Sequence, residues 1–244
     1  MKICYLANAQ SIHTQRWAKH FNARGHDITV ISFTPADISG VGVIVMPRYK
    51  VNRRVNVLMN IFAIRRWVNL IQPDILHAHY ATSYGFAGAL TGKHPYIVTA
   101  WGTDVLIEPE RSWIYRFLVY YALRKADLVT SMAPHMTERL IKRGYAAADR
   151  IITLPFGVDT EVFNLTRRTR SHGNQPAMVV STRRPDYGMD VDTFVEAIPY
   201  VRNNFPGLRF LIAGEGPRRQ YLYELAAKLG LNDCVEFRGE IDYE

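Results

Sequence analysis

Two histidines are the first side chains in this sequence whose type and spacing suit chemistry. His77 and His79 lie in the apolar run DILHAH, which is typical of a buried β-strand. Because alternate residues of a strand face the same side of a sheet, both imidazoles are expected to point the same way. That geometry suits a metal ion or a substrate, and we favour substrate because no third metal ligand is indicated nearby. His79 is the better candidate, since it lies nearer the carboxyl end of the strand.

An acidic residue follows the next strand-like run, PYIVTA. Gly102 permits a sharp turn there, and the Asp104 carboxylate would accept hydrogen bonds from the hydroxyls of a ligand such as a sugar. The alternative is that Thr103 or Asp104 caps the start of a helix. His13, in the loop after the first strand, is expected at the same edge of the sheet. The predicted cleft therefore contains His13, His79, Trp101, Gly102 and Asp104, and the catalytic candidates are Asp104 and His79.

A second group of residues suits a phosphate. The glycines of AGEGP end one strand-like run and open a helix, so that backbone N–H groups can approach an anion with the helix dipole behind them. The same pattern also fits an ordinary tight turn. Upstream, two arginines follow another strand, where guanidinium groups would neutralise a diphosphate. The predicted anion site contains Arg183, Arg184, Gly214, Glu215 and Gly216.

Two other motifs, and the absence of a third, argue against a metal site, a P-loop and a dinucleotide site. Asp190 and Asp192 lie at a predicted helix start, where acidic residues are favourable without any metal. TGKH lacks the upstream glycine spacing of a P-loop, and no Ser or Thr follows its lysine. No G-x-G-x-x-G follows the first strand, which argues against an oxidoreductase. We therefore expect neither a metal nor a resident cofactor.

Alternating elements must position these residues. Strand-like runs alternate with amphipathic, helix-like stretches along most of the chain. This repetition is typical of an α/β fold with a parallel sheet covered on both faces and with function at the carboxyl ends of the strands. The predicted strands are 2–7, 27–33, 41–46, 74–79, 95–100, 127–132, 150–154, 177–182, 208–214 and 234–239, and later helices are predicted at 192–201 and 218–229.

A polar, basic stretch rich in turn formers, NLTRRTRSHGNQP, interrupts the alternation. We predict a Rossmann-like N-terminal domain at 1–165, a linker at 166–176 and a second Rossmann-like domain at 177–244. A doubly wound domain needs about twice as many elements as the second domain offers, so we expect that domain to be incomplete and the natural protein to be longer.

Four segments in a defined order give the sequence a family resemblance. They are residues 74–90, 98–106, 154–163 and 211–222. Together they resemble glycosyltransferase family four, the retaining, group 1 transferases of the GT-B fold. The resemblance implies two facing Rossmann-like domains, with the acceptor mainly on the first and a nucleotide-diphosphate sugar mainly on the second. It also implies metal-independent sugar transfer with retention to a glycan or lipid-linked acceptor, in cell-envelope polysaccharide or glycoconjugate synthesis.

The sequence departs from the family pattern at several positions. Trp101 stands where many relatives have a histidine that reaches the transferred sugar, and Tyr187 stands where relatives have a lysine before the glycine. The loop that carries His13 lacks the paired glycines of relatives. The paired glutamates that hold the donor in relatives are absent from these residues, so we expect this chain as given to be weakly active or inactive. The alternative is a noncatalytic module that binds a nucleotide sugar or a glycan.

Composition limits the partners and the compartment. A formal net charge of +8 and a pI near 9.5 indicate an anionic partner, such as a phosphate-bearing substrate or an acidic lipid. Nucleic acid is disfavoured because the sequence lacks a helix-turn-helix pattern, zinc spacing or interleaved aromatics. Cys4 and Cys234 lie in apolar runs and are expected to be buried thiols. With no apolar run of about 18–20 residues, a cytoplasmic location is expected.

Two basic, aromatic stretches are candidates for contact with the inner face of a membrane. Residues 49–70 place Lys50, Arg54 and Arg65 near one angular position if they form one helix. We favour an ordinary amphipathic helix that covers the sheet there, with peripheral contact with an acidic membrane as the alternative. The second stretch contains Arg111, Trp113, Tyr115, Arg116 and Phe117.

Overall fold

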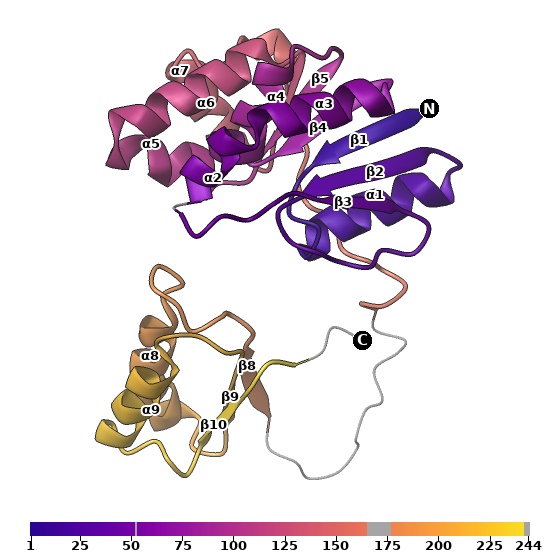
Figure 1. Ribbon diagram of the computed structural model, residues 1–244. Coiled ribbons are helices and arrows are strands. Elements are labelled where there is room, and N and C mark those ends of the chain that lie inside the picture. Colours follow the sequence, from indigo (N-terminus) through magenta and orange to yellow (C-terminus); the bar gives the residue numbers. More distant parts are fainter. Residues whose placement is uncertain (52, 165–176, 242–244) are drawn as a thin grey trace. The chain divides into compact units, whose positions relative to one another are not determined.

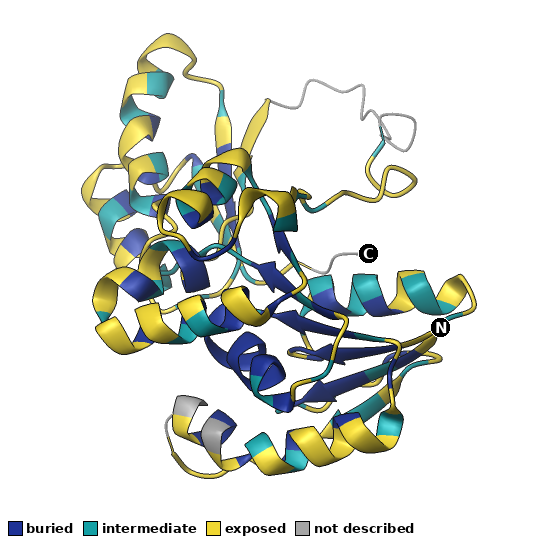
Figure 2. Ribbon diagram, turned by 90° about the horizontal axis from the view of Figure 1, so that it is seen from above, coloured by how far each residue is buried: buried dark blue, intermediate teal, exposed yellow. Residues whose placement is uncertain are grey.

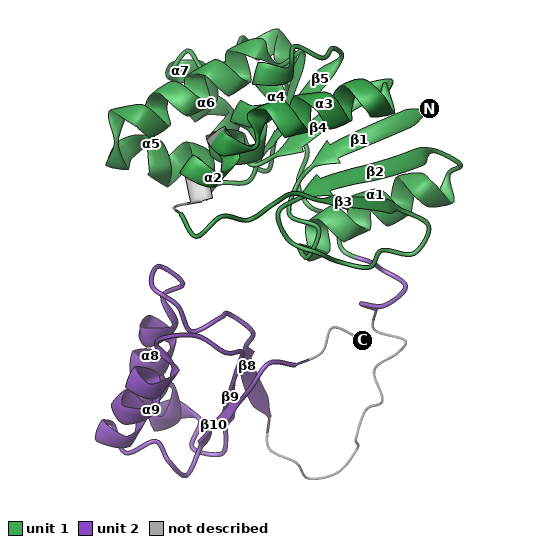
Figure 3. Ribbon diagram, in the orientation of Figure 1, with its two compact units in different colours: residues 1–158 green, residues 159–244 purple. Residues whose placement is uncertain are grey.

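The computed structural model describes residues 1–51, 53–164 and 177–241 and divides the chain into two compact units. Unit 1 is Met1–Val158 and unit 2 is Asp159–Glu244 (Figure 3). The boundary thus lies a few residues before the predicted one at 165. The predicted linker at 166–176 lies outside the described residues.

Unit 1 is built on a seven-stranded, fully parallel sheet (Figure 1). The strand order reverses direction at β1, since β2 and β3 lie on one side of it and β4 to β7 on the other. Such a reversal separates the loops at the carboxyl ends of β1 and β4 and leaves room for a ligand. In sheet order the strands are β3 (Gly42–Val45), β2 (Asp27–Ser32), β1 (Lys2–Leu6), β4 (Ile75–His79), β5 (Tyr96–Ala100), β6 (Leu128–Ser131) and β7 (Ile151–Thr153).

Helices cover both faces of this sheet, and alternate residues of β1 show the two faces. Ile3 and Tyr5 belong to the core beneath α1 (Ile12–Ala23), whereas Cys4 and Leu6 belong to the larger core on the opposite face. Burying each aliphatic side chain in such a core contributes about 1.5–3 kcal/mol. The central strands are therefore almost wholly buried (Figure 2). The larger core is covered by α3 (Ile61–Ile71), α4 (Phe86–Thr91), α6 (Trp113–Lys125) and α7 (Pro134–Lys142).

Three short elements shape the carboxyl edge of this sheet. Two single π-helical turns, η1 (Ala81–Gly85) and η2 (Thr103–Ile107), follow β4 and β5 directly. The short helix α5 (Glu108–Arg111) continues η2 and leads into α6. π-helical turns are rare and occur frequently at functional sites.

Unit 2 has a three-stranded parallel sheet in the order β10-β9-β8. The helices α8 (Val191–Asn204) and α9 (Arg219–Lys228) contact each other and share one core with the strands. The strands are β8 (Met178–Ser181), β9 (Arg209–Ala213) and β10 (Val235–Arg238). All ten predicted strands are present in the two units, and every observed bound lies within one residue of the predicted one.

The prediction of one continuous helix across residues 49–70 is wrong. The stretch forms α2 (Arg53–Met59) and α3, and buried Asn60 separates them. The Asn60 side-chain amide donates to the carbonyl oxygens of Pro47 and Asn56, at 3.1 and 2.8 Å. Asparagine competes in this way for backbone groups, and it therefore ends α2 there. Lys50 precedes α2 and Arg65 lies on α3, so they do not share one helix face.

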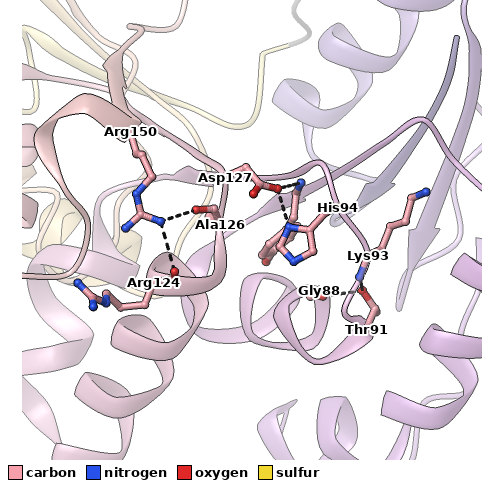
Figure 4. Close-up of polar contacts among 9 residues, drawn as sticks. Gly88, Thr91, Lys93, His94, Arg124, Ala126, Asp127 and Arg150 are labelled. Atoms are coloured by element: carbon pink, nitrogen blue, oxygen red, sulfur yellow. Dashed lines mark hydrogen bonds and ion pairs between the residues drawn. The ribbon is translucent and has the colours of Figure 1, made fainter.

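The TGKH segment lies at the opposite, amino edge of the unit 1 sheet (Figure 4). Gly92 ends α4 in the left-handed conformation, and Thr91 Oγ1 donates to the Gly88 carbonyl at 2.7 Å. The Asp127 carboxylate accepts hydrogen bonds from His94 Nδ1 and the Tyr96 N–H, each at 2.7 Å. These contacts hold the turn between α4 and β5, in agreement with the conclusion that TGKH is no P-loop.

Candidate functional site

A cluster of aromatic and imidazole rings occupies the carboxyl edge of the unit 1 sheet. His79 ends β4, Trp101 directly follows β5, and His13 lies in the first turn of α1. The Trp101 ring lies 5.3 Å from the His13 ring and 5.5 Å from the His79 ring, centroid to centroid. Three of the predicted cleft residues are thus brought together from a strand end, a loop and a helix start, and His13 lies in α1 and not in the preceding loop as predicted.

Phe156 completes this cluster from the loop after β7. Its ring stacks on His13 with a centroid separation of 3.9 Å and an interplanar angle of 9°. It also meets Trp101 edge to face at 5.8 Å. Offset and edge-to-face contacts of this kind stabilise the ring arrangement and fix the planes that a ligand would meet.

A pocket of about 550 Å³ opens beside the cluster, between α1 and the loop after β7. Its size is that of a small-molecule site. Arg16 and two imidazoles supply polar groups, and the other walls are aromatic and aliphatic. The lining residues are His13, Arg16, Trp17, His20, Phe21 and Leu154 to Val158.

Three nitrogen atoms of the cluster are shielded from solvent and have no hydrogen-bond partner. They are His13 Nδ1, His79 Nε2 and Trp101 Nε1, three of the four such side-chain atoms in the described part of the chain. An unpaired buried polar group costs about 1–3 kcal/mol, and proteins retain such groups mainly where they serve a function. Of the three residues, His13 also lines the pocket, so the group of unpaired nitrogens adjoins the pocket without opening into it.

Both strand histidines are neutral in this environment. Burial lowers the pKa of His77 to about 3, and burial together with the neighbouring His77 and His13 lowers the pKa of His79 well below its ordinary value. Their rings lie 4.8 Å apart on the same side of the sheet, as predicted. Nε2 of His77 contacts Thr99 Oγ1 at 2.7 Å, and Nδ1 of His79 contacts Thr14 Oγ1 at 3.3 Å. Nε2 of His79 is unpaired, but it is shielded from solvent and His79 does not line the pocket.

Asp104 does not face the pocket. Its side chain is completely buried, and its carboxylate accepts the backbone N–H groups of Ala81, Trp101 and Gly102 at 2.7, 3.0 and 2.9 Å. Burial is the largest influence on this carboxyl and raises its pKa to about 6, although the three hydrogen bonds act in the opposite direction. Direct contact with a ligand hydroxyl is corrected, because the carboxylate is buried and its oxygens accept backbone N–H groups. The alternative that Thr103 or Asp104 is the N-cap residue is also corrected, because Gly102 occupies the N-cap position of η2. Asp104 instead joins the two loops that carry His79 and Trp101.

Glu108 reinforces the same junction. Its carboxylate accepts hydrogen bonds from the hydroxyls of Tyr80, at 2.9 Å, and Thr82. Tyr80, the residue after His79, has φ = 78°, a conformation that is uncommon for a residue with a side chain. Strained backbone persists where the surrounding structure holds it and is concentrated at functional sites. Tyr80 is thus held by a contact from α5, and the next residue, Ala81, is held by Asp104 of η2.

In unit 2 the predicted anion residues lie in two loops that touch. Arg183 and Arg184 follow β8, and the AGEGP loop follows β9. A Cβ atom on Gly216 would lie 2.0 Å from the Pro185 carbonyl oxygen, so only glycine permits this approach. The Arg218 N–H donates to the same carbonyl at 3.1 Å. Both arginines are exposed at the carboxyl edge, and Arg183 also lines a shallow hollow of about 460 Å³ with the start of α8.

Contrary to the prediction from the sequence, Gly214 and Glu215 are not directed at an anion but hold the loop in place. The Gly214 N–H is shared between the carbonyl oxygens of Arg238 and Gly239, at 3.2 and 3.0 Å, so it holds β10 and is not directed at an anion. The Glu215 carboxylate pairs with Arg219 at 2.8 Å. These two residues shape the loop. The Arg183 guanidinium remains suited to bind an anion, whereas Nε of Arg184 lies 3.6 Å from the Asp186 carboxylate, which competes with an anion for this arginine.

Asp190 and Asp192, which the sequence disfavours as metal ligands, have other partners. Asp192 pairs with Arg218 at 2.8 Å, and Asp190 accepts a hydrogen bond from Thr193 at 2.9 Å. Among the residues that the structure describes, no group of three or more His, Cys, Asp or Glu side chains is placed to hold a metal ion. Metal independence stays a prediction.

Sequence reasoning did not single out Arg16, Trp17 or Phe156. Trp17 and Arg16 are one helical turn beyond His13, a spacing that places them on neighbouring positions of α1. Phe156 lies within one of the four family segments, but nothing in its local sequence shows that its ring reaches His13. The helical spacing of Arg16 and Trp17 from His13, and the position of Phe156 in a family segment, indicate a site only after the strand order is known.

The two parallel sheets, each with its loops at the carboxyl edge, define a two-unit, Rossmann-like α/β protein. Comparison with known proteins gives the family. The family described as Glycosyl transferase 4-like matches residues 2–133, and the family described as Glycosyl transferases group 1 matches residues 163–244. The chain belongs to the glycosyl transferase 4-like, group 1 glycosyltransferases. The predicted family and the GT-B, Rossmann-like fold class are confirmed.

Individual relatives agree with this assignment. A GDP-mannose-dependent phosphatidylinositol monomannoside mannosyltransferase of Mycobacterium tuberculosis is 31% identical over 123 residues, 47% of this chain and 31% of that protein. An uncharacterized glycosyltransferase of Methanocaldococcus jannaschii is 26% identical over 242 residues, 96% of this chain and 63% of that protein. The chain therefore spans less than two thirds of the length of either relative. The Anabaena protein HepE in complex with UDP has the same fold, with a TM-score of 0.75, 17% identity and coverage of 99% of this chain and 70% of that one.

Proposed function

We propose that the protein transfers a sugar from a nucleotide-diphosphate sugar to a glycan or lipid-linked acceptor. The observation that carries the proposal is the group of three unpaired nitrogens, of His13, His79 and Trp101, beside the pocket of unit 1 in a chain of this family. A polyhydroxylated acceptor supplies several oxygens that can pair with them. The aromatic walls of the pocket suit the apolar faces of sugar rings.

Each unit has its own part in the proposed reaction. In unit 1, the acceptor occupies the pocket beside His13, and movement of the stacked rings brings its oxygens to the Trp101 N–H and to Nε2 of His79, which are shielded in the described structure. In unit 2, Arg183 and Arg184 neutralise the diphosphate as it departs, a task that fixed cations perform well without a metal. The relatives support a nucleotide-sugar donor, since the mycobacterial enzyme is GDP-mannose-dependent and HepE was crystallised with UDP.

The finer features of the proposal come from the family resemblance. They are retention at the anomeric carbon, the absence of a resident metal or cofactor, and a place in cell-envelope polysaccharide or glycoconjugate synthesis. The reaction is proposed to take place in the cytoplasm, with peripheral contact with the acidic inner face of the membrane. Within the described residues, no helix combines the length and the apolar composition that a bilayer span requires.

Replacing Trp101 by Phe tests the proposed site in unit 1. Phenylalanine keeps an aromatic ring against His13 and Phe156 but removes the indole N–H. Loss of one buried donor costs about 1–3 kcal/mol, so we expect kcat/KM to fall about 10- to 100-fold. The measurement is transfer of radiolabelled sugar from UDP-glucose, UDP-N-acetylglucosamine or GDP-mannose to a lipid-linked glycan.

Trp67→Phe is the matched control, since this tryptophan is 40% exposed on α3, away from the cluster. Its transfer rate is expected to equal that of the unaltered protein. Equal rates for Trp101→Phe and Trp67→Phe would show that the indole N–H does not contact the acceptor.

A further inference from the structure

The helix α6 exposes a stripe of aromatic side chains. Trp113, Phe117 and Tyr120 are 77%, 52% and 45% exposed, and their spacing of four and three residues places them on one helix face. The opposite face holds the buried residues Tyr115, Val119, Ala122 and Leu123. The stripe therefore points away from the core, and packing within unit 1 does not explain it.

Cationic side chains accompany the stripe. Arg116 and Arg124 are exposed on the same side of α6, and the Arg124 guanidinium lies 5.8 Å from the centre of the Tyr120 ring. The helix sequence WIYRFLVYYALRK contains no acidic residue. Aromatic rings next to basic groups are typical of helices that lie in the interface of a membrane.

Acidic groups at the two ends of α6 offset only part of this charge. Glu110 forms ion pairs with Arg139 and Arg143, at 2.7 and 2.6 Å, and also attracts Arg116 through its charge. Asp127 pairs with His94 at 2.7 Å. The exposed face of α6 thus carries a net positive charge, since Glu110 is shared among three arginines and α6 itself has no acidic residue. This charge is complementary to anionic lipid headgroups, and each basic residue near such a surface contributes about 1 kcal/mol.

We propose that the exposed face of α6, formed by Trp113, Arg116, Phe117, Tyr120 and Arg124, docks on a lipid bilayer that contains anionic lipids. Trp113 and Phe117 enter the interface between headgroups and acyl chains, while the arginines bind lipid phosphates. The proposal names the surface for the membrane contact included in the proposed function. The exposed face of α6 replaces residues 49–70 as the main candidate surface for membrane contact, because residues 49–70 are divided between α2 and α3.

Sedimentation with vesicles tests this proposal. The full chain is expected to sediment with vesicles of equal amounts of phosphatidylcholine and phosphatidylglycerol, but not with phosphatidylcholine alone. Trp113→Ser combined with Phe117→Ser is expected to reduce the bound fraction at least tenfold, and Arg116→Gln combined with Arg124→Gln at least fivefold. Tyr200→Ser is the matched control, because this residue is 74% exposed in unit 2 and its loss should leave binding unchanged.

Several outcomes would overturn the proposal. They are no binding to the anionic vesicles, equal binding to both vesicle types, and unchanged binding by the Trp113 and Phe117 variant. A concentration-dependent dimer that Trp113→Ser dissolves would assign the stripe to a second copy of the chain. Each of these leaves the proposed transferase function intact, because sugar transfer to a soluble glycan acceptor is measured without vesicles.

Discussion

Replacing Asp104 by Ala is expected to lower the free energy of unfolding of unit 1 by about 3–5 kcal/mol, because three backbone N–H groups would lose their acceptor inside the protein. The side chain has no exposed surface, so water cannot replace the carboxylate without rearrangement of η1 and η2. Urea unfolding followed by tryptophan fluorescence measures this effect. All 4 tryptophans of the sequence, Trp17, Trp67, Trp101 and Trp113, lie in unit 1, so the signal reports that unit alone.

Asp104→Asn separates the charge from the shape of this side chain. The folded-state pKa of Asp104 is raised to about 6 from an ordinary value of 3.8, so the folded state binds the proton more tightly. Its contribution to stability is therefore largest in acid and falls as the pH rises from about 4 to about 6, by about 3 kcal/mol in all. Asparagine does not titrate, so the stability difference between the unaltered protein and Asp104→Asn is expected to shrink over this range.

Taking the difference between the two proteins also removes the contribution of the buried histidines. The lowered pKa values of His77 and His79 make stability rise with pH between about 3 and about 6.5, the opposite direction, and they do so in both proteins. A difference that stays constant from about pH 4 to about pH 6 would contradict the described burial of the Asp104 carboxyl.

Replacing Gly216 by Ala is expected to destabilise unit 2 by about 3 kcal/mol, because the new methyl group would overlap the Pro185 backbone. The added Cβ would lie 2.0 Å from the Pro185 carbonyl oxygen and 2.7 Å from its carbon, and neither atom belongs to a flexible side chain. Hydrogen exchange detected by mass spectrometry is suitable because unit 2 contains no tryptophan. Amides of β8 and β9 are expected to exchange about 100-fold faster, with unit 1 unchanged.

Gly207→Ala is the control for this substitution. Gly207 lies in the turn between α8 and β9, and an added Cβ there meets no atom within 4 Å. Its exchange is expected to match that of the unaltered protein. Similar exchange for Gly216→Ala and Gly207→Ala would mean that the loops after β8 and β9 do not contact each other as described.

The sequence predicted the positions of the strands and the edge at which the site lies, because both follow from local patterns. Alternating apolar runs fix each strand, and a parallel α/β fold brings the strand ends together. His13, His79 and Trp101 could therefore be grouped although they are far apart in the sequence. The chemistry of the site came only from the family resemblance, and Trp101 departs from the residue that is common in the family.

The role of Asp104 could not be predicted, because its hydrogen bonds depend on how two loops pack in three dimensions. A carboxylate after a glycine is compatible with a ligand contact, a helix cap or a buried bridge, and local sequence does not separate these. The contribution of Phe156 was missed for the same reason, since its ring reaches His13 only after β7 joins the sheet. The break at Asn60 had a local signal, because asparagine is unfavourable inside helices, but the apolar periodicity around it was stronger.

Binding of nucleotide sugars to unit 2 tests the central claim most directly. Calorimetric titration of the full chain with UDP-glucose and GDP-mannose is expected to show weak binding of one of them, because the paired glutamates that hold the donor in relatives are absent from residues 1–244. Arg183→Ala is expected to weaken this binding at least tenfold. Arg209→Ala is the matched control, since Arg209 is exposed at the amino end of β9, on the opposite edge of the sheet, and its loss should leave the affinity unchanged. Absence of binding by both nucleotide sugars, or equal affinities for Arg183→Ala and Arg209→Ala, would contradict the account.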